Sequence, residues 1–285
     1  MLDGPHQYLL NEVVLMNYYE ISEEDLGKQS KIPLLKLGES GEVYYEMALE
    51  MVKGIKKNNA IGKKTVYILP VGPIGQYPIF VRLVNSEKIS LKNTWFINMD
   101  EYLNDDGSYI DEKSPLSFRG FMKRVVYDKI DQELVMPVSQ RIFPNPDYPE
   151  RITSLIKELG GVDICFGGIG INGHLAFNEA QEIGAEDFAQ LHTRTISISD
   201  QTRVATAIGD LGGAIEAMPK KAVTIGMAEI LQAKKIRIGV FREWHRAVVR
   251  KAAYGEISGN FPATLLQNHP DSLIYLNHNA AIKPF

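Results

Sequence analysis

The chain has 285 residues and a mass of 31.9 kDa, and its 45% hydrophobic and 23% charged residues are ordinary values for a globular protein. A formal net charge of −4 provides no broad basic surface for nucleic acid or for an anionic membrane. One cysteine, Cys165, excludes an intramolecular disulfide, and its place within an apolar segment predicts a small buried side chain rather than a nucleophile.

The amino-terminal 40 residues carry no pattern for export or membrane insertion. Asp3, Glu12 and Glu20 lie among the apolar residues, which argues against a secretory signal. No apolar run in the chain approaches the length of a membrane span. The acidic residues between 20 and 25 predict a solvated face. We therefore expect a cytoplasmic protein.

Beyond residue 40, apolar strand candidates alternate with amphipathic segments. Helical spacing of apolar residues predicts a helix over 42–57, and a turn followed by a helix is predicted within 72–85. The other predicted helices cover 117–129, 201–208, 227–233 and 244–254, and the predicted strands cover 65–70, 94–98, 162–167, 193–198, 222–226, 235–241 and 272–276. This alternation predicts an α/β fold of three layers, a mostly parallel, Rossmann-like sheet with helices on both faces. No linker or repeat divides the chain, so a single domain is expected over 1–285.

The most informative segment is the run GGIGINGHLAFNE at 167–179, directly after a predicted strand. Its four glycines in seven positions allow a tight turn and close backbone approach to a ligand. Loops at the carboxyl ends of strands bind ligands in open α/β sheets, and His174 with Glu179 supplies a titratable pair for acid–base chemistry. The alternative is a structural turn whose histidine is only hydrogen-bonded.

No cofactor or metal is expected. Gly168, Gly170 and Gly173 satisfy G-x-G-x-x-G, but a dinucleotide site would also need a helix opening there and an acid about 20 residues on. The next acid near a strand end is Asp200. The remaining histidines show no ligand-like pairing with one another or with cysteine; these are His6, His192, His245, His269 and His278.

A second polar segment follows the predicted strand 94–98, which ends in Met99-Asp100-Glu101-Tyr102. Two adjacent acids after a buried strand are costly unless they are solvated or paired, so they predict a site, with a solvated loop as the alternative. Together the segments 98–102 and 167–179 resemble the glucosamine-6-phosphate deaminase/isomerase family, which carries N-M-D-E-Y and G-G-x-G-x-D-G-H-x-A-F-N-E. The resemblance extends in order over roughly residues 40 to 280, through segments 114–118, 193–195, 200–203, 222–227 and 261–270.

The resemblance implies an enzyme that opens a 2-amino sugar 6-phosphate, isomerises it to the ketose and releases ammonia. It implies that Asp100 moves a proton between C2 and C1, that His174 opens the ring and that Glu179 supports His174. The residues expected to bind the substrate are Gly72, Gly75, Glu101, Gly170, Gly173, Arg203 and Arg246. The resemblance also implies the parallel-sheet fold of the deaminase/isomerase family.

Asn172 stands where the family usually has aspartate beside the histidine. An amide can accept a hydrogen bond from the ring, but it cannot offset an imidazolium charge, and it can also donate and so hold the other tautomer. Weaker support for His174 is therefore expected. On this basis Asn172→Asp should raise activity on glucosamine 6-phosphate if that ligand binds.

The phosphate-binding residues of the family are also altered. Its T-G-x-T-P loop cradles a phosphate at a helix amino terminus, whereas the run at 69–77 is two residues shorter, Val71 has no hydroxyl and Pro73 has no N–H. The family lysine falls on Arg246, a family arginine falls on Ile208, and Ile196 replaces a lysine of allosteric members. We therefore expect weak binding of glucosamine 6-phosphate, a ligand that differs at that end, and no allosteric activation.

The leading hypothesis is an isomerase/deaminase that acts on an amino sugar or related aldose, phosphorylated or free. One alternative is a catalytically degenerate sugar-binding or regulatory protein, suggested by Asn172 and the altered loop. Another is a sugar-phosphate lactonase-like hydrolase, against which the intact run 98–102 argues. The expected partner is a small sugar or sugar phosphate, with no nucleic acid and no membrane. A homo-oligomer is compatible with the sequence, which leaves the oligomeric state and the identity of the sugar open.

Overall fold

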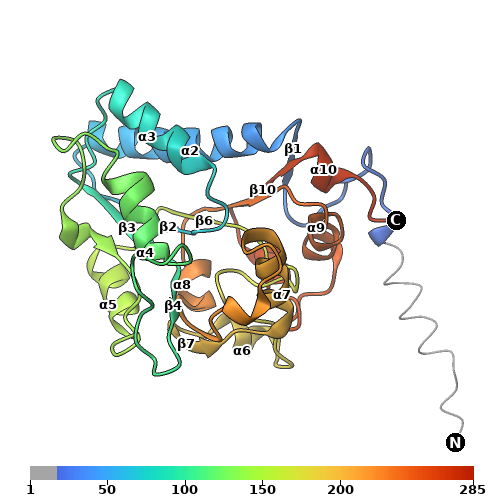
Figure 1. The fold of residues 1–285 in the computed structure, drawn as a ribbon. Helices are drawn as coiled ribbons and strands as arrows, with labels where there is room; N and C mark the ends of the chain where they lie inside the picture. The colour runs from blue at the N-terminus through green and yellow to red at the C-terminus, as the bar shows by residue number, and fades with distance from the viewer. Residues whose placement is uncertain (1–17) are drawn as a thin grey trace, which may run out of the picture.

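The computed structural model describes residues 18–285, so Asp3, His6 and Glu12 lie outside the described residues. At its centre is a parallel sheet of seven strands in the order β1-β10-β9-β6-β2-β3-β5 (Figure 1). The strands are β1 (Leu34–Leu37), β2 (Thr65–Leu69), β3 (Thr94–Asn98), β5 (Arg141–Ile142), β6 (Ile164–Gly167), β9 (Ile236–Val240) and β10 (Ser272–Asn277). The predicted α/β class with a parallel sheet is confirmed. The two edge strands β1 and β5 were not predicted, because they are too short to show a pattern.

Helices cover both faces of this sheet because its central strands are buried on both sides. Tyr67 and Leu69 face the layer of α2 (Ser40–Ala60) and α3 (Gln76–Ser86), whereas Val66 and Ile68 face the opposite layer. That opposite layer contains α5 (Arg151–Glu158), α6 (Ala185–Ala189), α8 (Met227–Leu231), α9 (His245–Tyr254) and α10 (His278–Ala281). Figure 1 shows α2 and α3 above the sheet and α8 below it. Cys165 lies completely buried in β6, as predicted.

A second, antiparallel sheet was not predicted. It consists of β4 (Asp100–Leu103), β8 (Lys221–Thr224) and β7 (Arg194–Ser197). The predicted strands 193–198 and 222–226 therefore exist but do not join the main sheet, and the polar end expected after strand 94–98 forms a strand of its own. Tyr102, Met218 and Ala222 are part of a small separate core beneath this sheet.

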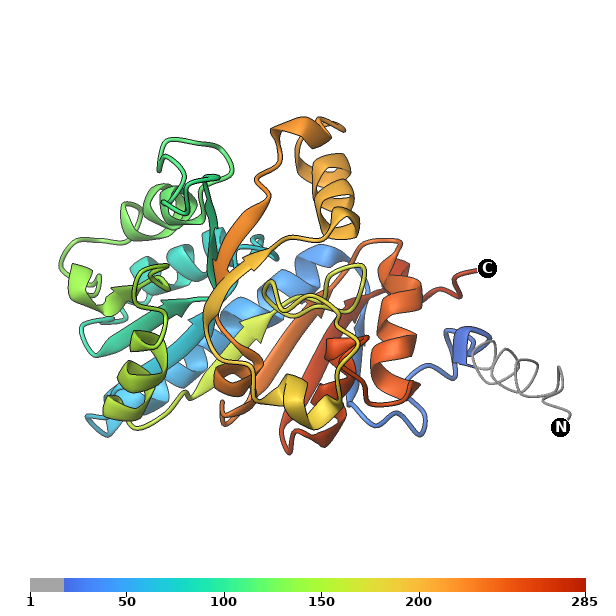
Figure 2. The same cartoon turned by 90° about the horizontal axis from the view of Figure 1, so that it is seen from below.

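Three predicted helices differ in detail. The helix expected over 117–129 divides into α4 (Phe118–Met122) and a π-helical turn, η1 (Lys123–Tyr127). The helix α7 (Asp200–Asp210) extends the predicted 201–208 by a residue or two at each end, and α8 is two residues shorter than predicted. Figure 2 shows α7 and the turn after it projecting beyond the main sheet. Within residues 18–285, no helix combines the length and apolar character that crossing a bilayer requires.

The strand order reverses between β2 and β6. From β2 the chain continues to β3 and β5 on one side, whereas β6 lies on the other side of β2 and is followed outward by β9 and β10. The loops after β2 and β6 thus leave neighbouring strands in opposite directions. A crevice opens at the carboxyl ends of strands where the order reverses in this way, and it is the usual ligand site of open α/β sheets.

Candidate active site

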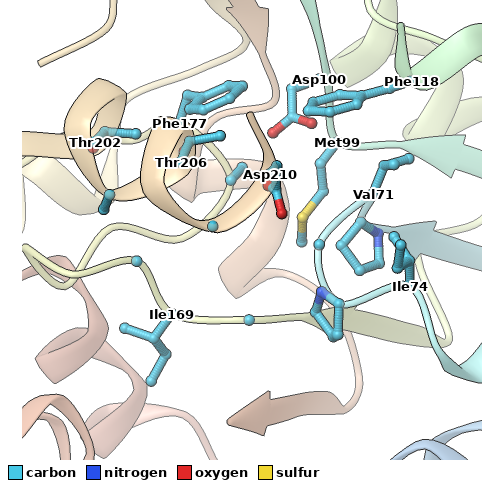
Figure 3. Close-up of a pocket in the computed structure, with 18 of the residues that line it drawn as sticks. Val71, Ile74, Met99, Asp100, Phe118, Ile169, Phe177, Thr202, Thr206 and Asp210 are labelled. Atoms are coloured by element: carbon cyan, nitrogen blue, oxygen red, sulfur yellow. The ribbon is translucent and has the colours of Figure 1, made fainter. Parts of the chain in front are cut away.

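A cavity of about 600 Å³ lies at this reversal point. Its walls come from the loops after β2, β3, β6 and β9 and from one face of α7. Figure 3 shows Val71 and Ile74 on one side of the cavity and Thr202 and Thr206 of α7 on the other. Four residues predicted from the sequence line this cavity together, namely Gly72, Asp100, Gly170 and His174.

Asp100 is the first residue of β4, and its carboxylate faces the cavity (Figure 3). Only 6% of the residue is exposed, and within residues 18–285 no side-chain hydrogen bond or ion pair reaches its carboxylate. Burial raises the pKa of Asp100 well above its ordinary value, and the charge of Glu101 adds to this effect. A carboxylate with a raised pKa, free of protein partners, is suited to accept and return a proton of a bound ligand.

Glu101 points away from the cavity, because successive residues of a strand face opposite sides. Its carboxylate accepts hydrogen bonds from the backbone N–H groups of Phe118 and Arg119 at 3.0 and 2.8 Å and from the Ser117 hydroxyl at 2.9 Å. The Arg119 guanidinium also lies 3.2 Å away. Glu101 therefore holds the amino terminus of α4 and is not among the residues that line the cavity, so its role in binding substrate stays a prediction.

His174 belongs to a chain of hydrogen bonds that ends at Glu179. The Nδ1 atom of His174 lies 2.7 Å from Oδ1 of Asn172, and Nδ2 of Asn172 donates to Oε2 of Glu179 at 2.6 Å. The direct distance from His174 Nδ1 to Glu179 Oε2 is 3.7 Å, so the amide lies between the two. Burial lowers the pKa of His174, although the charge of Glu179 opposes the shift. The ring is thus neutral near pH 7, with its proton on Nδ1 and with Nε2 as an acceptor.

The start of α7 fixes Glu179 in this position. Glu179 accepts from the backbone N–H and the hydroxyl of Ser199, at 3.2 and 3.0 Å, and from the Thr202 hydroxyl at 3.1 Å. Ser199 is also the N-cap of α7, since its hydroxyl accepts from the N–H of Thr202. The glycine-rich loop and α7 are therefore tied together directly behind His174.

The glycines of the predicted set have different roles. A Cβ at Gly170 would lie 2.0 Å from the His174 ring, so only glycine lets the ring lie over the loop at this point. At Gly75 a Cβ would lie 2.3 Å from the Tyr44 ring, and at Gly173, whose φ is +84°, it would lie 2.6 Å from the Phe261 ring. Gly75 and Gly173 pack beneath aromatic rings and are not among the residues that line the cavity, so their role in binding substrate stays a prediction.

Neither of the two predicted arginines lines the cavity. Arg246 donates to the backbone carbonyl and side-chain oxygen of Asn279, at 3.0 and 2.6 Å. Arg203 pairs with Asp200 at 3.1 Å. Their guanidinium groups are held by these partners, so a role of either arginine in binding substrate stays a prediction. Among the described residues, no group of three His, Cys, Asp or Glu side chains is placed to hold a metal ion.

Arg242 and His245, just before and at the start of α9, line the cavity instead. The Nδ1 atom of His245 accepts from the backbone N–H groups of Phe241 and Arg242, at 3.1 and 2.8 Å, and Nε2 donates to the Ile169 carbonyl at 3.0 Å. Burial lowers the pKa of His245 to about 3, so this ring is neutral. His245 therefore braces two loops and occupies two backbone donors that would otherwise be available to a ligand.

Arg242 is the cation at the mouth of the cavity. Its guanidinium lies 3.5 Å from the Asp210 carboxylate, on the last turn of α7. A Cβ at Gly209 would meet the Nη1 atom of Arg242 at 2.5 Å, so the guanidinium rests on that glycine. Arg242 and Arg246 occur in one short basic run, and the sequence alone does not reveal which of them faces the ligand.

A buried carboxylate and a neutral histidine at one cavity, at the reversal point of a parallel sheet, define a site for acid–base chemistry on a small ligand. The glucosamine-6-phosphate deaminase of Bacillus pumilus is 31% identical to this chain over 214 residues, which cover 73% of this chain and 82% of that protein. The enzyme of the same name from Clostridium perfringens is 30% identical over 242 residues, covering 82% and 92%. The chain belongs to the glucosamine-6-phosphate deaminase family, which confirms the resemblance seen in its motifs.

Solved structures agree with this assignment. A monomeric glucosamine-6-phosphate deaminase matches with a TM-score of 0.75 and 29% identity, covering 87% of this chain and 98% of that one. The 6-phosphogluconolactonase from Trypanosoma cruzi matches with a TM-score of 0.63 but only 16% identity, over 88% and 96% of the two chains, so it shares the fold alone. No family model matches the chain.

Proposed function

We propose that the protein is an aldose–ketose isomerase/deaminase that converts a 2-amino sugar and water into a ketose and ammonia. The observation that carries the proposal is the placement of the unpaired Asp100 carboxylate and the His174 ring on one cavity. The names of the relatives support a deaminase. The cytoplasmic location and the single domain expected from the sequence stay predictions.

In the first step, Nε2 of His174 accepts the proton of the C1 hydroxyl and delivers a proton to the ring oxygen, which opens the sugar to the aldehyde. The fixed tautomer suits this role, because the Nδ1 proton is held by Asn172 and Nε2 is the free acceptor. When the ring is transiently protonated, the charge of Glu179 stabilises it through the intervening amide. Asn172 and Glu179 are therefore positioning residues.

In the second step, the Asp100 carboxylate removes the proton from C2 of the open chain while the aldehyde oxygen takes up a proton from water, giving an enolamine. Asp100 then returns its proton to C1, and the nitrogen releases one proton to water. The product is an imine at C2, which water hydrolyses to the ketose and ammonia. One carboxylate can serve both transfers because C1 and C2 are adjacent. Its raised pKa supports this proposal, since a base whose pKa approaches the working pH is better matched to the exchange.

The test is to incubate the protein with free and 6-phosphorylated glucosamine and galactosamine and to measure ammonia, ketose and the entry of solvent deuterium at C1. We expect all three signals from at least one sugar in the wild type and none from Asp100→Asn. Binding of a sugar without deuterium entry or ammonia release would reject the isomerase/deaminase and favour the degenerate binding protein.

A further inference from the structure

The walls of the cavity do not carry the charge that a phosphate needs. Among the residues that line it, the charged side chains are the carboxylates of Asp100 and Asp210 and the guanidinium of Arg242. The two histidines in the lining, His174 and His245, are neutral near pH 7, as described above. The single cation already has Asp210 as its neighbour at 3.5 Å. The lining is therefore neutral to negative, and it complements a neutral or cationic ligand better than a dianion.

The hydrogen-bond donors of the cavity also do not favour a phosphate. The loop after β2 presents Pro70, Val71, Pro73 and Ile74 to the cavity, and none of these side chains can donate. The Gln76 amide, which follows this loop, turns back to the Pro73 carbonyl at 2.8 Å. Across the cavity, His245 uses the N–H groups of Phe241 and Arg242. The backbone N–H groups of Val71, Gly72 and Ile74 are the donors that this loop leaves for a ligand.

Arg242 and Asp210 offer a different kind of recognition. Gly209 supports the guanidinium, and the Phe241 ring beside Arg242 packs edge-on against Tyr44 with 5.0 Å between centroids. A carboxylate and a guanidinium held side by side present acceptors and donors together, which suits neighbouring hydroxyl groups of a sugar. A phosphate placed there would meet the carboxylate of Asp210 as well as Arg242.

We propose that the substrate of this site is a 2-amino sugar without a phosphate group, whose hydroxyls at the end remote from C1 bind between Asp210 and Arg242. Its ammonium group adds one positive charge, which matches a lining with two carboxylates and one guanidinium. The inference rests on the proposed function for the C1–C2 end of the sugar. It assigns Asp210 as the residue that selects against the phosphorylated form.

The test is calorimetric binding of glucosamine, galactosamine and their 6-phosphates to the wild type, Asp210→Asn and Asp200→Asn. The last variant is the matched control, because Asp200 lies on the same helix with its side chain 90% exposed. We expect the wild type and the control to bind a free amino sugar at least about tenfold more tightly than its phosphate. We expect Asp210→Asn to weaken the free sugar and to strengthen the phosphate by about tenfold.

Tighter binding of both 6-phosphates by the wild type would overturn the inference and show that the backbone amides of the loop after β2 suffice for a phosphate. Failure of every probe to bind would also overturn it. Turnover separates this result from the proposed function. Ammonia release from the phosphates alone would keep the deaminase and reject the inference, whereas tight binding of a free amino sugar without turnover would do the reverse.

Discussion

The Nδ1 atom of His174 lies 2.7 Å from Oδ1 of Asn172, and this contact determines which ring nitrogen carries the proton. The orientation of the amide follows from its other end, which lies 2.6 Å from the Glu179 carboxylate. Because a carboxylate only accepts, the NH₂ group faces Glu179 and the carbonyl faces the histidine. The amide thus holds the tautomer in which Nε2 is free, whereas the sequence raised the prospect of the other one.

Asn172→Asp is therefore expected to lower activity, which reverses the expectation from the sequence. The substitution would place a second carboxylate against Glu179 in the space that an N–H···O bond of 2.6 Å now fills. One of the two acids must then take up a proton or move, and His174 loses its fixed partner. We expect kcat/KM to fall about tenfold or more across pH 6 to 8. Asn260→Asp, at an exposed position, controls for the added charge. A higher kcat/KM in Asn172→Asp would restore the original expectation.

Gly170→Ala tests how closely His174 must be placed. The new Cβ would lie 2.0 Å from the imidazole ring, so the ring has to shift. Since a displacement of about 1 Å can cost roughly a hundredfold in rate, we expect kcat to fall by about that factor. Gly41→Ala is the control, because its Cβ would meet no atom within 4 Å. Unchanged kcat in a folded Gly170→Ala protein would mean that His174 takes no part in the chemistry.

Glu101→Gln distinguishes the role of Glu101 from that of Asp100, the other acid of the segment 99–102. The Glu101 carboxylate is fully buried and faces the Arg119 guanidinium and the first amides of α4. Removing its charge is expected to lower the free energy of unfolding by about 3–5 kcal/mol, as for a broken buried ion pair, and to leave KM unchanged. Urea unfolding measures the first quantity, with Glu243→Gln, whose side chain is 78% exposed, as the control. A raised KM at unchanged stability would show that Glu101 binds the substrate instead.

The sequence located the two central catalytic candidates because each follows a buried strand. Continuous apolar runs predict parallel strands, and the polar residues after them must meet at one edge of the sheet. The sequence could not show which sheet the strands 193–198 and 222–226 join, because strands of both sheets have similar patterns of apolar residues. Arg246 was expected at the ligand because the family lysine falls on it, but at the start of α9 one residue turns a side chain by about 100°, and His245 lines the cavity instead. Gly75 and Gly173 indicated close contacts, but the sequence does not reveal that the contacts are with Tyr44 and Phe261.

Asp100→Asn is expected to lower turnover by a factor of about 10² to 10⁴, because an amide cannot accept the C2 proton. The raised pKa of Asp100 adds a second expectation, for stability. A group with a raised pKa in the folded state contributes stability below its unfolded pKa, and this contribution is lost as the pH rises through the folded value. Near pH 7 the buried charge therefore destabilises the wild type, so Asn, which resembles the protonated acid, should raise Tm there and give no gain in acid.

Thermal unfolding of the two proteins between pH 4 and 8 measures this difference, with Asp106→Asn as the opposite case. The pKa of Asp106 is lowered by hydrogen bonds from Ser108, so its charge contributes stability that is lost as the pH falls, and its removal should give no gain at pH 7. In the wild type, kcat/KM should fall as the pH drops through the raised pKa of Asp100, because the base becomes protonated. An Asp100→Asn protein that is less stable than the wild type at pH 7 would show that the folded cavity stabilises the carboxylate. In that case Asp100 would be a structural charge, and the proton transfer between C2 and C1 would need another base.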